Sequence, residues 1–406
     1  MTPVNIILPN CYDEAHIIWT DKQNIKRLIG TNQLVNVCAS LEDSPTGKAT
    51  IFFKMHGGIE QYNNASLFDG SCLDSIPKEW YFDINRDRMR IVVDTSNESW
   101  SPSYNGTYPE HEVVELHEIL THKLIDLGIN HKALTWVTGD MNAEEHFADY
   151  SGVNIRSHCQ AYFMSHGILW DTHTKDFSSN LSEETFENFS LCLMRDLRKE
   201  HRLYSIYKMR AENGLQGMVK TTSPKRHGDQ TICDNYATLY HYYKHHNYET
   251  PINWANMRNH LLDYYVYSPF EVPNDDIDEA QRRSLFALVS ESFCFGDKNF
   301  ITYSTFRAIL SKRPFVIFGN KGVLKQLRAW GFETFDGILL DESYDDMDDG
   351  FARVDAAVVA LKYNKVKNLP RLEAYERVQG IVEHNYNHFM KSQPTAADKY
   401  LELFKW

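Results

Sequence analysis

The first part of the chain alternates short apolar runs with polar segments. Five runs are rich in β-branched or aromatic residues and each ends at a turn signal, which predicts strands over residues 4–9, 49–58, 90–96, 133–140 and 152–159. Between the third and fourth runs, apolar residues recur at helical spacing and the pattern stops at Gly128: Val113, Leu116, Leu120, Leu124 and Leu127. Alternating strands and helices predict a parallel sheet with helices on its faces.

A polar stretch over residues 171–189 interrupts this pattern, which then restarts. The second part predicts strands over 189–194 and 284–293 and a helix over 201–214. Residues 228–268 are an insertion rich in tyrosine and histidine. A chain of 406 residues can bury two cores, so we predict an α/β protein with two Rossmann-like halves and a cleft between them.

Residues 300–320 predict a short helix followed by a buried strand. The run from Pro314 to Phe318 is continuously apolar, and the preceding helix has a buried stripe made of Phe306, Ile309 and Leu310. Thr302 is a favourable N-cap. The N–H groups of that first turn can hold an anion, with help from Thr302, Tyr303, Ser304 and Arg307. An ordinary capped helix explains these residues better when they are taken alone.

Composition narrows the class of protein. Hydrophobic residues make up 42% of the chain and no apolar run reaches the length of a membrane span, so we expect a globular protein without a membrane partner. The first apolar run lacks a preceding basic region, so we expect no signal peptide. Seven dispersed cysteines without a C-x-x-C pair favour reduced thiols, a cytoplasmic location and no structural zinc.

The charge distribution adds one candidate site. A net charge of −13 argues against a protein that coats nucleic acid, although it leaves room for a local basic cleft. A predicted strand ends at Met194, and basic or titratable side chains follow it: Arg195, Arg198, His201 and Arg202. Ligands of open α/β sheets bind at the carboxyl ends of strands, and guanidinium groups suit a diphosphate. A basic first turn opposes the helix dipole, so we favour a binding role over a solvated helix start.

These segments carry a family resemblance. Residues 290–345, which begin SESFCFGDKNFITYSTFRAIL, resemble glycosyltransferase-like proteins of T-even-like and marine phages. They are more distantly similar to α-1,3-fucosyltransferases, with their E-N-S and Y-I-T-E-K pattern. The phage family's L-N-R-x-x-R-x-H-R segment resembles CLMRDLRKEHR, residues 192–202. VTGDMN and IVVDTSNES resemble its N-terminal half, so the resemblance covers most of the chain outside 228–268.

The resemblance implies a GT-B fold of two Rossmann-like domains facing across a cleft. The corresponding divisions are an acceptor domain over 1–175, a donor domain over 185–385 and a helical tail over 386–406. It implies a nucleotide-sugar donor, with no tightly bound cofactor and no required metal, held by Arg195, Arg198, His201, Arg202, Glu291, Thr302, Tyr303 and Arg307. The family's glutamate and lysine are replaced here by Tyr303 and Ser304, which implies altered donor ligands or a decayed transferase.

The phage relationship also implies an acceptor. Phages of that kind glycosylate hydroxymethylated bases, so the resemblance implies UDP-glucose or UDP-arabinose as donor, 5-hydroxymethylcytosine in double-stranded DNA as acceptor, and the host cytoplasm as location. A surface glycan or a protein is an alternative acceptor. A decayed, non-catalytic protein that binds a nucleotide or glycan is an alternative of another class. A Rossmann oxidoreductase is disfavoured because no G-x-G-x-x-G follows a strand.

Sugar transfer with inversion needs a general base near the acceptor hydroxyl. Our first choices are Glu98, which follows the predicted strand 90–96, and Asp94, which lies near the carboxyl end of that strand, and then Glu60 and His56. Asp140 follows another predicted strand and is a further candidate. Each of these residues is also explained as an ordinary loop residue or helix cap.

Two apparent metal motifs are set aside. HEVVELHEILTHK lacks H-E-x-x-H, and a solvated amphipathic helix explains it better. Asp346 and Asp348 have the D-x-D spacing of metal-dependent transferases, but they lie in an acidic run before a predicted helix over 352–363, where acids suit the helix dipole.

Overall fold

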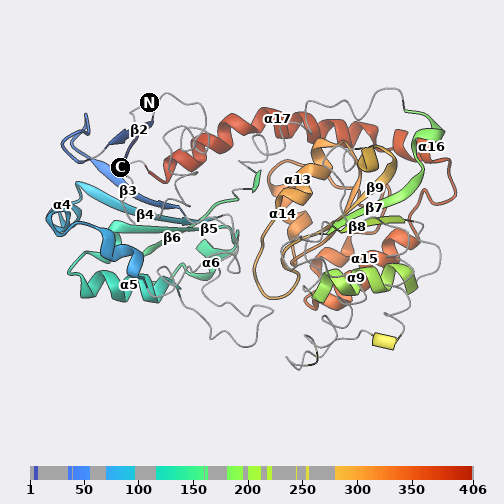
Figure 1. Cartoon of the computed structure of the whole chain (residues 1–406). Coiled ribbons are helices and arrows are strands. Elements are labelled where there is room, and N and C mark those ends of the chain that lie inside the picture. Colours follow the sequence, from blue (N-terminus) through green and yellow to red (C-terminus); the bar gives the residue numbers. More distant parts are fainter. Residues whose placement is uncertain are drawn as a thin grey trace, which may run out of the picture.

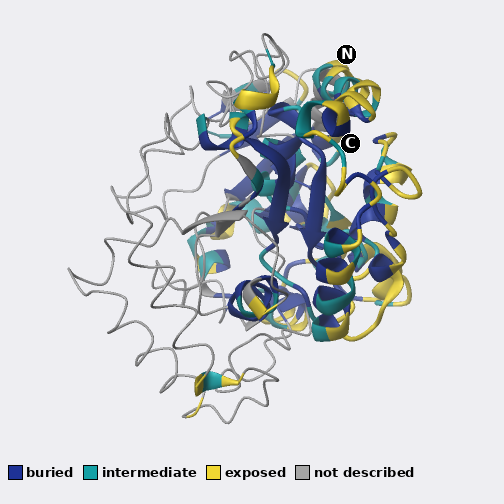
Figure 2. Ribbon diagram, turned by 90° about the vertical axis from the view of Figure 1, so that its right-hand side faces the viewer, coloured by how far each residue is buried: buried dark blue, intermediate teal, exposed yellow. Residues whose placement is uncertain are grey.

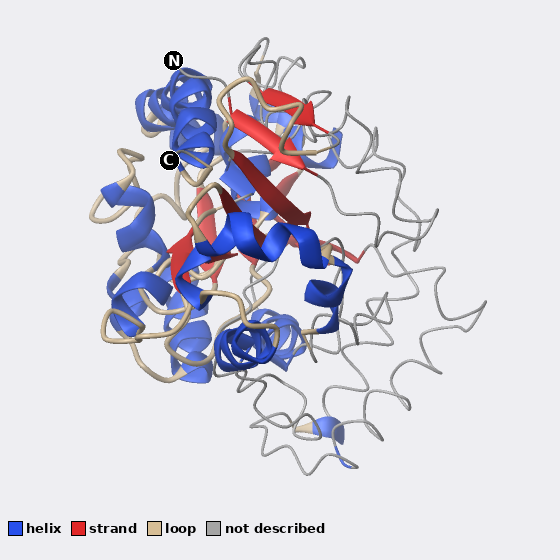
Figure 3. Cartoon of the chain, turned by 90° about the vertical axis from the view of Figure 1, so that its left-hand side faces the viewer, coloured by secondary structure: helices blue, strands red, loops and turns tan. Residues whose placement is uncertain are grey.

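The chain folds into two parallel α/β units joined by a long C-terminal helix (Figure 1). The computed structural model describes residues 4–7, 35–38, 40–54, 70–96, 116–159, 161–162, 181–194, 200–211, 217–221, 244, 253–255 and 279–404. Strands occupy the middle of the molecule and helices lie around them (Figure 3). The predicted fold class, α/β with two units that are each built on a parallel sheet, is confirmed by these two sheets.

The N-terminal unit is built on a six-stranded sheet in the order β2-β1-β3-β4-β5-β6, and all its described pairings are parallel. Its strands are β1 Val4–Ile7, β2 Val35–Cys38, β3 Ala49–Lys54, β4 Met89–Thr95, β5 Leu134–Thr138 and β6 Asn154–Ser157. Its described α-helices are α4 Tyr81–Asn85, α5 Leu116–Asp126 and α6 Ala143–His146. Alternate strand residues such as Ile51, Ile91 and Trp136 meet Leu120 and Leu124 of α5 in one core.

The C-terminal unit is built on a four-stranded parallel sheet in the order β10-β9-β7-β8. Its strands are β7 Asn188–Met194, β8 Gly217–Thr221, β9 Ser284–Ser290 and β10 Phe315–Phe318. Its helices include α9 Glu200–Ala211, α13 Tyr303–Leu310, α14 Val323–Ala329, α15 Gly350–Lys362 and α16 Arg371–Glu376. Every residue of β9 and β10 is buried, as expected for strands covered on both faces (Figure 2).

Helix α17, Gln379–Glu402, connects the two units. It packs on α13 in the C-terminal unit and crosses to the N-terminal sheet (Figure 1). There the Tyr400 hydroxyl donates to the buried Asp94 carboxylate at the end of β4. The Phe404 ring lies 5.2 Å from the Phe52 ring in an edge-to-face contact. The predicted C-terminal tail is therefore the second half of a helix that begins at Gln379, and its end is buried against the first unit.

Most of the predicted elements are confirmed within the described residues, including the helix ending near Gly128, which has φ 71°. Strands β2 and β8 were not predicted from the sequence. The insertion at 228–268 lies outside the described residues except for 244 and 253–255.

The histidine-rich helix differs from the prediction of a solvated helix. His117 is buried on α5, and its ring lies 4.5 Å from the Tyr150 ring in an edge-to-face contact. The His117 backbone is also bonded to this tyrosine, because the hydroxyl groups of Thr121 and Tyr150 both donate to the His117 carbonyl oxygen. One histidine of the motif is therefore part of the core.

Two residues of the acidic run before α15 cap helices, although they are not the Asp346 and Asp348 of the D-x-D spacing. Both Asp345 carboxylate oxygens accept backbone N–H bonds from the first turn of α14. Asp349 is the N-cap of α15 and accepts from Ala352 N at 2.7 Å, while Asp348 pairs with Lys321. The described residues contain no group of three histidine, cysteine, aspartate or glutamate side chains that could hold a metal ion, and no described helix is long and apolar enough to cross a membrane.

The Tyr400–Asp94 contact gives a first testable prediction. Tyr400→Phe removes a donor from a fully buried carboxylate, so we expect the free energy of unfolding to fall by about 1–3 kcal/mol. Urea titration measures this change. Tyr363→Phe is the matched control, because Tyr363 is 62% exposed and should change stability by less than about 0.5 kcal/mol. Equal urea midpoints for Tyr400→Phe and Tyr363→Phe would contradict a stabilising hydrogen bond between Tyr400 and Asp94.

Candidate functional site

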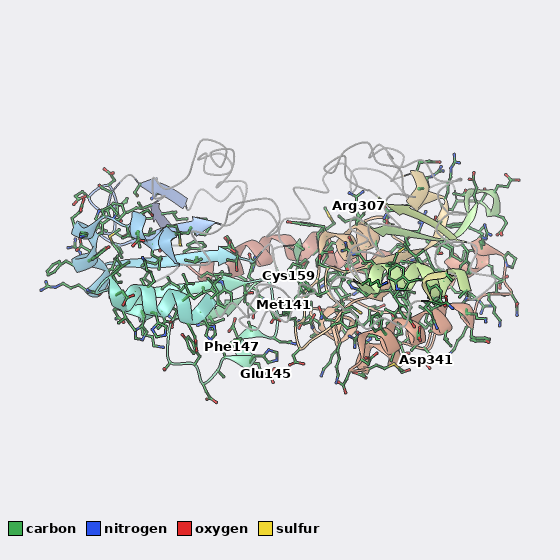
Figure 4. The ribbon with its side chains drawn as sticks, turned by 60° about the horizontal axis from the view of Figure 1, so that its bottom comes forward. Met141, Glu145, Phe147, Cys159, Arg307 and Asp341 are labelled. Atoms are coloured by element: carbon green, nitrogen blue, oxygen red, sulfur yellow. The ribbon has the colours of Figure 1, made fainter. Side chains whose placement is uncertain are left out.

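The two units meet where the carboxyl end of β5 touches the loop that follows β9. Met141 N donates to the Asn299 carbonyl oxygen at 2.8 Å, and Asn299 N donates to Asp140 Oδ1 at 2.9 Å. Asn142 Nδ2 donates to the Asp297 carbonyl oxygen at 2.7 Å. Figure 4 shows Met141 and Cys159 between the two units. These bonds place the carboxyl ends of strands from both sheets at one contact, where ligands of parallel α/β sheets bind.

Asp140 is the titratable group at the centre of this contact. It follows β5 and is fully buried, and its Oδ1 atom accepts N–H bonds from Asn142 and Asn299. Its Oδ2 atom has no hydrogen-bond partner among the described residues. Burial raises the pKa of Asp140, and the two backbone bonds, His146 and Lys298 act in the opposite direction. A carboxylate with a raised pKa and an unused oxygen has the properties of a general base.

Several buried polar atoms without partners among the described residues lie at or after strand ends of the two sheets. They are the hydroxyls of Ser96 and Ser290 and side-chain oxygens of Asp140, Asn299 and Asn320. Ser96 follows β4, Ser290 ends β9 and Asn320 follows β10. Buried polar groups in folded proteins nearly always have a partner, so these atoms are candidates for contact with a polar ligand.

Glu291 occupies the helix mouth that the sequence indicated as an anion site. It follows β9 directly, is fully buried, and its carboxylate accepts from Thr302 N at 3.0 Å and from Thr305 Oγ1 at 2.5 Å. Thr302 is the N-cap of α13 as predicted, with Ser304 N donating to its Oγ1 atom. Burial raises the pKa of Glu291. The first turn of α13 thus already binds the protein's own carboxylate, which favours the capped-helix alternative.

His201 and Arg202 lie in the first turn of α9 and are both buried. Nε2 of His201 is 2.8 Å from the Glu291 carbonyl oxygen. Arg202 donates to that same oxygen from Nε and Nη2, at 3.3 and 3.2 Å, and to the Ser290 carbonyl oxygen at 3.4 Å. These side chains fix the carboxyl end of β9, and their donor-binding roles stay predictions.

A second buried arginine was not identified from the sequence. Arg353 on α15 donates to the Gly319 carbonyl oxygen at 2.9 Å and also bonds the carbonyl oxygens of Cys294 and Met347. It therefore ties together the loops after β9 and β10. Arg202 and Arg353 thus place two guanidinium groups at this sheet edge, beside the Glu291 carboxylate, whose ionised form Arg202 favours. A lone arginine in an amphipathic helix gives no sequence signal of this role.

The other predicted site residues are placed as follows. Asp94 is fully buried, and its carboxylate accepts from Ser96 N at 2.8 Å and from the Tyr400 hydroxyl. Tyr303 and Arg307 are half-buried on α13, and Figure 4 shows Arg307 on the C-terminal unit. The remaining predicted residues lie outside the described residues: His56, Glu60, Glu98, Arg195 and Arg198. The structure brings Asp140 to the contact between the units, although the sequence ranked it behind Asp94 and Glu98.

No protein-family model and no curated protein match the chain. Similar solved structures include an α1,3-fucosyltransferase, with 11% identity and a TM-score of 0.35 over 98% of this chain and 90% of that one. An α1,3-fucosyltransferase with GDP has 13% identity and a TM-score of 0.31, over 94% and 91%. A UDP-forming α,α-trehalose-phosphate synthase from Burkholderia xenovorans has 13% identity and a TM-score of 0.45, over 97% and 79%.

The environment of Asp140 predicts a stability effect with a defined pH dependence. A pKa raised on folding means that Asp140 contributes stability below its unfolded pKa and loses that contribution as the pH rises through the folded value. Asp140→Asn keeps an oxygen for both N–H bonds and removes the buried charge. We expect its melting temperature at pH 7 to exceed that of the wild type by about 1–3 °C, and the gain to shrink towards pH 4.

Scanning calorimetry over this pH range measures the effect, and Asp126→Asn on the exposed side of α5 is the control, expected to be neutral. A gain that grows towards acid pH would show that the charge of Asp140 is not disfavoured by its surroundings.

Proposed function

We propose that this protein is a glycosyltransferase that moves a sugar from a nucleotide sugar to a hydroxyl group of an acceptor. The observation that carries the proposal is the contact at Asp140, where a buried carboxylate of one parallel sheet meets the carboxyl edge of the other. Arg202 and Arg353 place guanidinium groups at that second edge. A base and guanidinium groups on opposite units match the two needs of sugar transfer: a deprotonated acceptor and a stabilised leaving diphosphate.

In the proposed reaction, the acceptor oxygen forms a bond to the anomeric carbon while the bond from that carbon to the diphosphate breaks. Asp140 accepts the proton of the acceptor hydroxyl, and the negative charge on the diphosphate faces the carboxyl edge of β9 and β10. The proposed donor ligands are Arg195, Arg198, His201, Arg202, Glu291, Thr302, Tyr303 and Arg307. Glu98, Asp94, Glu60 and His56 are the other proposed base candidates. Arginines and helix termini can carry the diphosphate charge, so the proposal requires no metal ion.

The finer identity of the substrates rests on the sequence resemblance. It supports UDP-glucose or UDP-arabinose as donor and 5-hydroxymethylcytosine in phage DNA as acceptor. Such a base must leave the stack before its hydroxyl can reach Asp140. The net charge of −13 disfavours DNA, so a surface glycan or a protein is the second proposed acceptor class. A non-catalytic nucleotide- or glycan-binding protein is the alternative function, and the Glu291 carboxylate at the mouth of α13 is the observation that favours it.

Donor binding is tested by thermal shift against UDP, GDP, CDP, ADP and their common sugars. A ligand that binds only the folded protein stabilises it by mass action and so raises its melting temperature. At a ligand concentration a hundredfold above Kd, the free energy of unfolding rises by about 2.7 kcal/mol. We expect a shift with one nucleotide family, and its loss in Arg195→Ala and Arg198→Ala. Lys132→Ala, on the 3-10 turn that precedes β5 at the opposite end of the sheet, should keep the shift. An absence of any shift would disprove a nucleotide donor.

Transfer is tested with the donor so identified and with three acceptors: hydroxymethylated duplex DNA, a glycan array and the protein's host lysate. We expect Asp140→Asn to lower kcat by about 10²–10⁴-fold, since it removes general-base catalysis, while the donor-induced thermal shift stays unchanged. Measurable transfer by radiolabelled sugar separates the enzyme from the non-catalytic alternative. Nucleotide binding without transfer or donor hydrolysis would support that alternative, and full activity in the variant would remove Asp140 from the mechanism.

A further inference from the structure

A surface hollow on the C-terminal unit takes no part in the site proposed above. It has a volume of about 280 Å³ and lies between α15 and residues 339–344, and its described lining includes Leu339, Leu340, Tyr344 and Val359. Figure 4 shows Asp341, which also lines it, away from Met141 and Cys159 at the contact between the units. Val359 is also about 9 Å along the axis of α15 from Arg353, which bonds the loops at the carboxyl edge. The hollow therefore lies apart from the candidate site.

The hollow follows a second apolar face of α15. The core-facing positions of this helix are already buried: Val354, Ala357, Val358 and Leu361. The residues that line the hollow have the i, i+3, i+4 and i+7 spacing of another face: Ala356, Val359, Ala360 and Tyr363. Val359 is 45% exposed and Tyr363 is 62% exposed, and Ile338, beside the lining residue Leu339, is 44% exposed. Apolar surface that stays exposed around a hollow is typical of an interaction site.

Lysine side chains surround this apolar surface. Residues 361–369 contain three lysines and no acidic residue, although the net charge of the chain is −13. The ammonium groups of Lys362 and Lys367 lie 5.5 and 5.0 Å from the centre of the Tyr363 ring. Lys365 lines the hollow itself. The hollow is therefore bordered by positively charged groups at the end of α15.

The charges favour one class of occupant. Asp341 is the one acidic side chain in the described lining, and it is held in its own loop, where it accepts from Ser343 N at 3.0 Å. A symmetric pair of copies would bring the lysines of one copy against those of the other, because each patch then meets itself. An acidic partner removes this repulsion and is attracted to the lysines. A membrane surface is met by side chains that protrude, whereas Leu340 and Val359 line a hollow.

We propose that the hollow is a docking site for an acidic peptide segment of a partner protein. The segment inserts a large apolar side chain into the hollow, and its carboxylates lie beside Lys362, Lys365 and Lys367. The apolar face from Ala356 to Tyr363 is about 10 Å long, which matches two turns of a partner helix laid into a groove. This docking site adds a partner to the proposed glycosyltransferase, and it does not depend on that activity.

The first experiment selects ligands from a phage-displayed library of short random peptides on the full-length protein. Val359→Asp serves for counter-selection, because it places a charge in the hollow without removing a buried side chain. We expect the enriched peptides to carry leucine, phenylalanine or tryptophan next to aspartate or glutamate. The proposal is overturned if no peptide is enriched, if the enriched peptides are neutral or basic, or if they bind Val359→Asp equally well.

The second experiment measures the Kd of an enriched peptide by fluorescence anisotropy. Val359→Asp should raise the Kd by at least about tenfold, since it removes an apolar contact and repels the peptide carboxylates. Ile125→Asp is the matched control and should keep the wild-type Kd, because Ile125 is 55% exposed on α5 of the other unit. Equal Kd values for the two variants would place the peptide elsewhere and refute the docking site.

Charge reversal tests the lysines separately from the apolar face. Lys362→Glu combined with Lys367→Glu should raise the Kd about fivefold, and added salt should weaken the wild-type binding. Lys132→Glu combined with Lys391→Glu gives the same net charge at exposed positions outside the hollow, so its Kd should stay close to the wild-type value. Equal effects of the two charge reversals would contradict an acidic partner.

Vesicles of phosphatidylglycerol and phosphatidylcholine test the membrane alternative. We expect the protein to stay in the supernatant when the vesicles are sedimented. Sedimentation with the vesicles that is lost in Val359→Asp would assign the hollow to a membrane surface and overturn the peptide proposal.

Discussion

The bond from the Asn299 amide to the Asp140 carboxylate is the interaction on which the arrangement of the two units depends. It joins the carboxyl end of β5 to the loop after β9, with Met141 and Asn142 making the flanking bonds. Both sheets are parallel, so their ligand-binding edges are set by the direction of the strands alone. Because the carboxyl edges of the two sheets meet, the two Rossmann-like units form one candidate site between them.

The edge of the C-terminal sheet is organised around charged groups that bond backbone atoms. Glu291 accepts from the first turn of α13, while Arg202 binds the carbonyl group of the same residue. Arg353 holds the neighbouring loop through Gly319. Each of these side chains forms hydrogen bonds with a backbone N–H or carbonyl group and so holds the segments after β9 and β10 in place.

Local features of this fold were predictable, and long-range ones were not. The Thr302 cap, the buried stripe of α13 and the strand at Phe315–Phe318 follow from patterns within one element. The bond between Glu291 and Thr302 spans eleven positions and the bond between Asp140 and Asn299 spans 159, so no local pattern contains either. The prediction of a solvated helix was wrong at His117 for the same reason, because the ring of His117 packs on Tyr150, which lies outside its own helix.

Apolar packing offsets the buried charges at the contact between the units. Tyr162, which follows β6, stacks on Phe306 of α13 with ring centres 5.1 Å apart and on Trp330 at 5.4 Å. Helix α17 adds a second attachment at Phe404 and Phe52. Aromatic pairs of this kind contribute about 0.5–1.5 kcal/mol each beyond the area they bury. The aromatic contacts thus lie beside the strand ends, and the buried Asp140 carboxylate lies at one of them. Their stabilisation offsets the cost of burying this carboxylate, so the two units stay in contact around it.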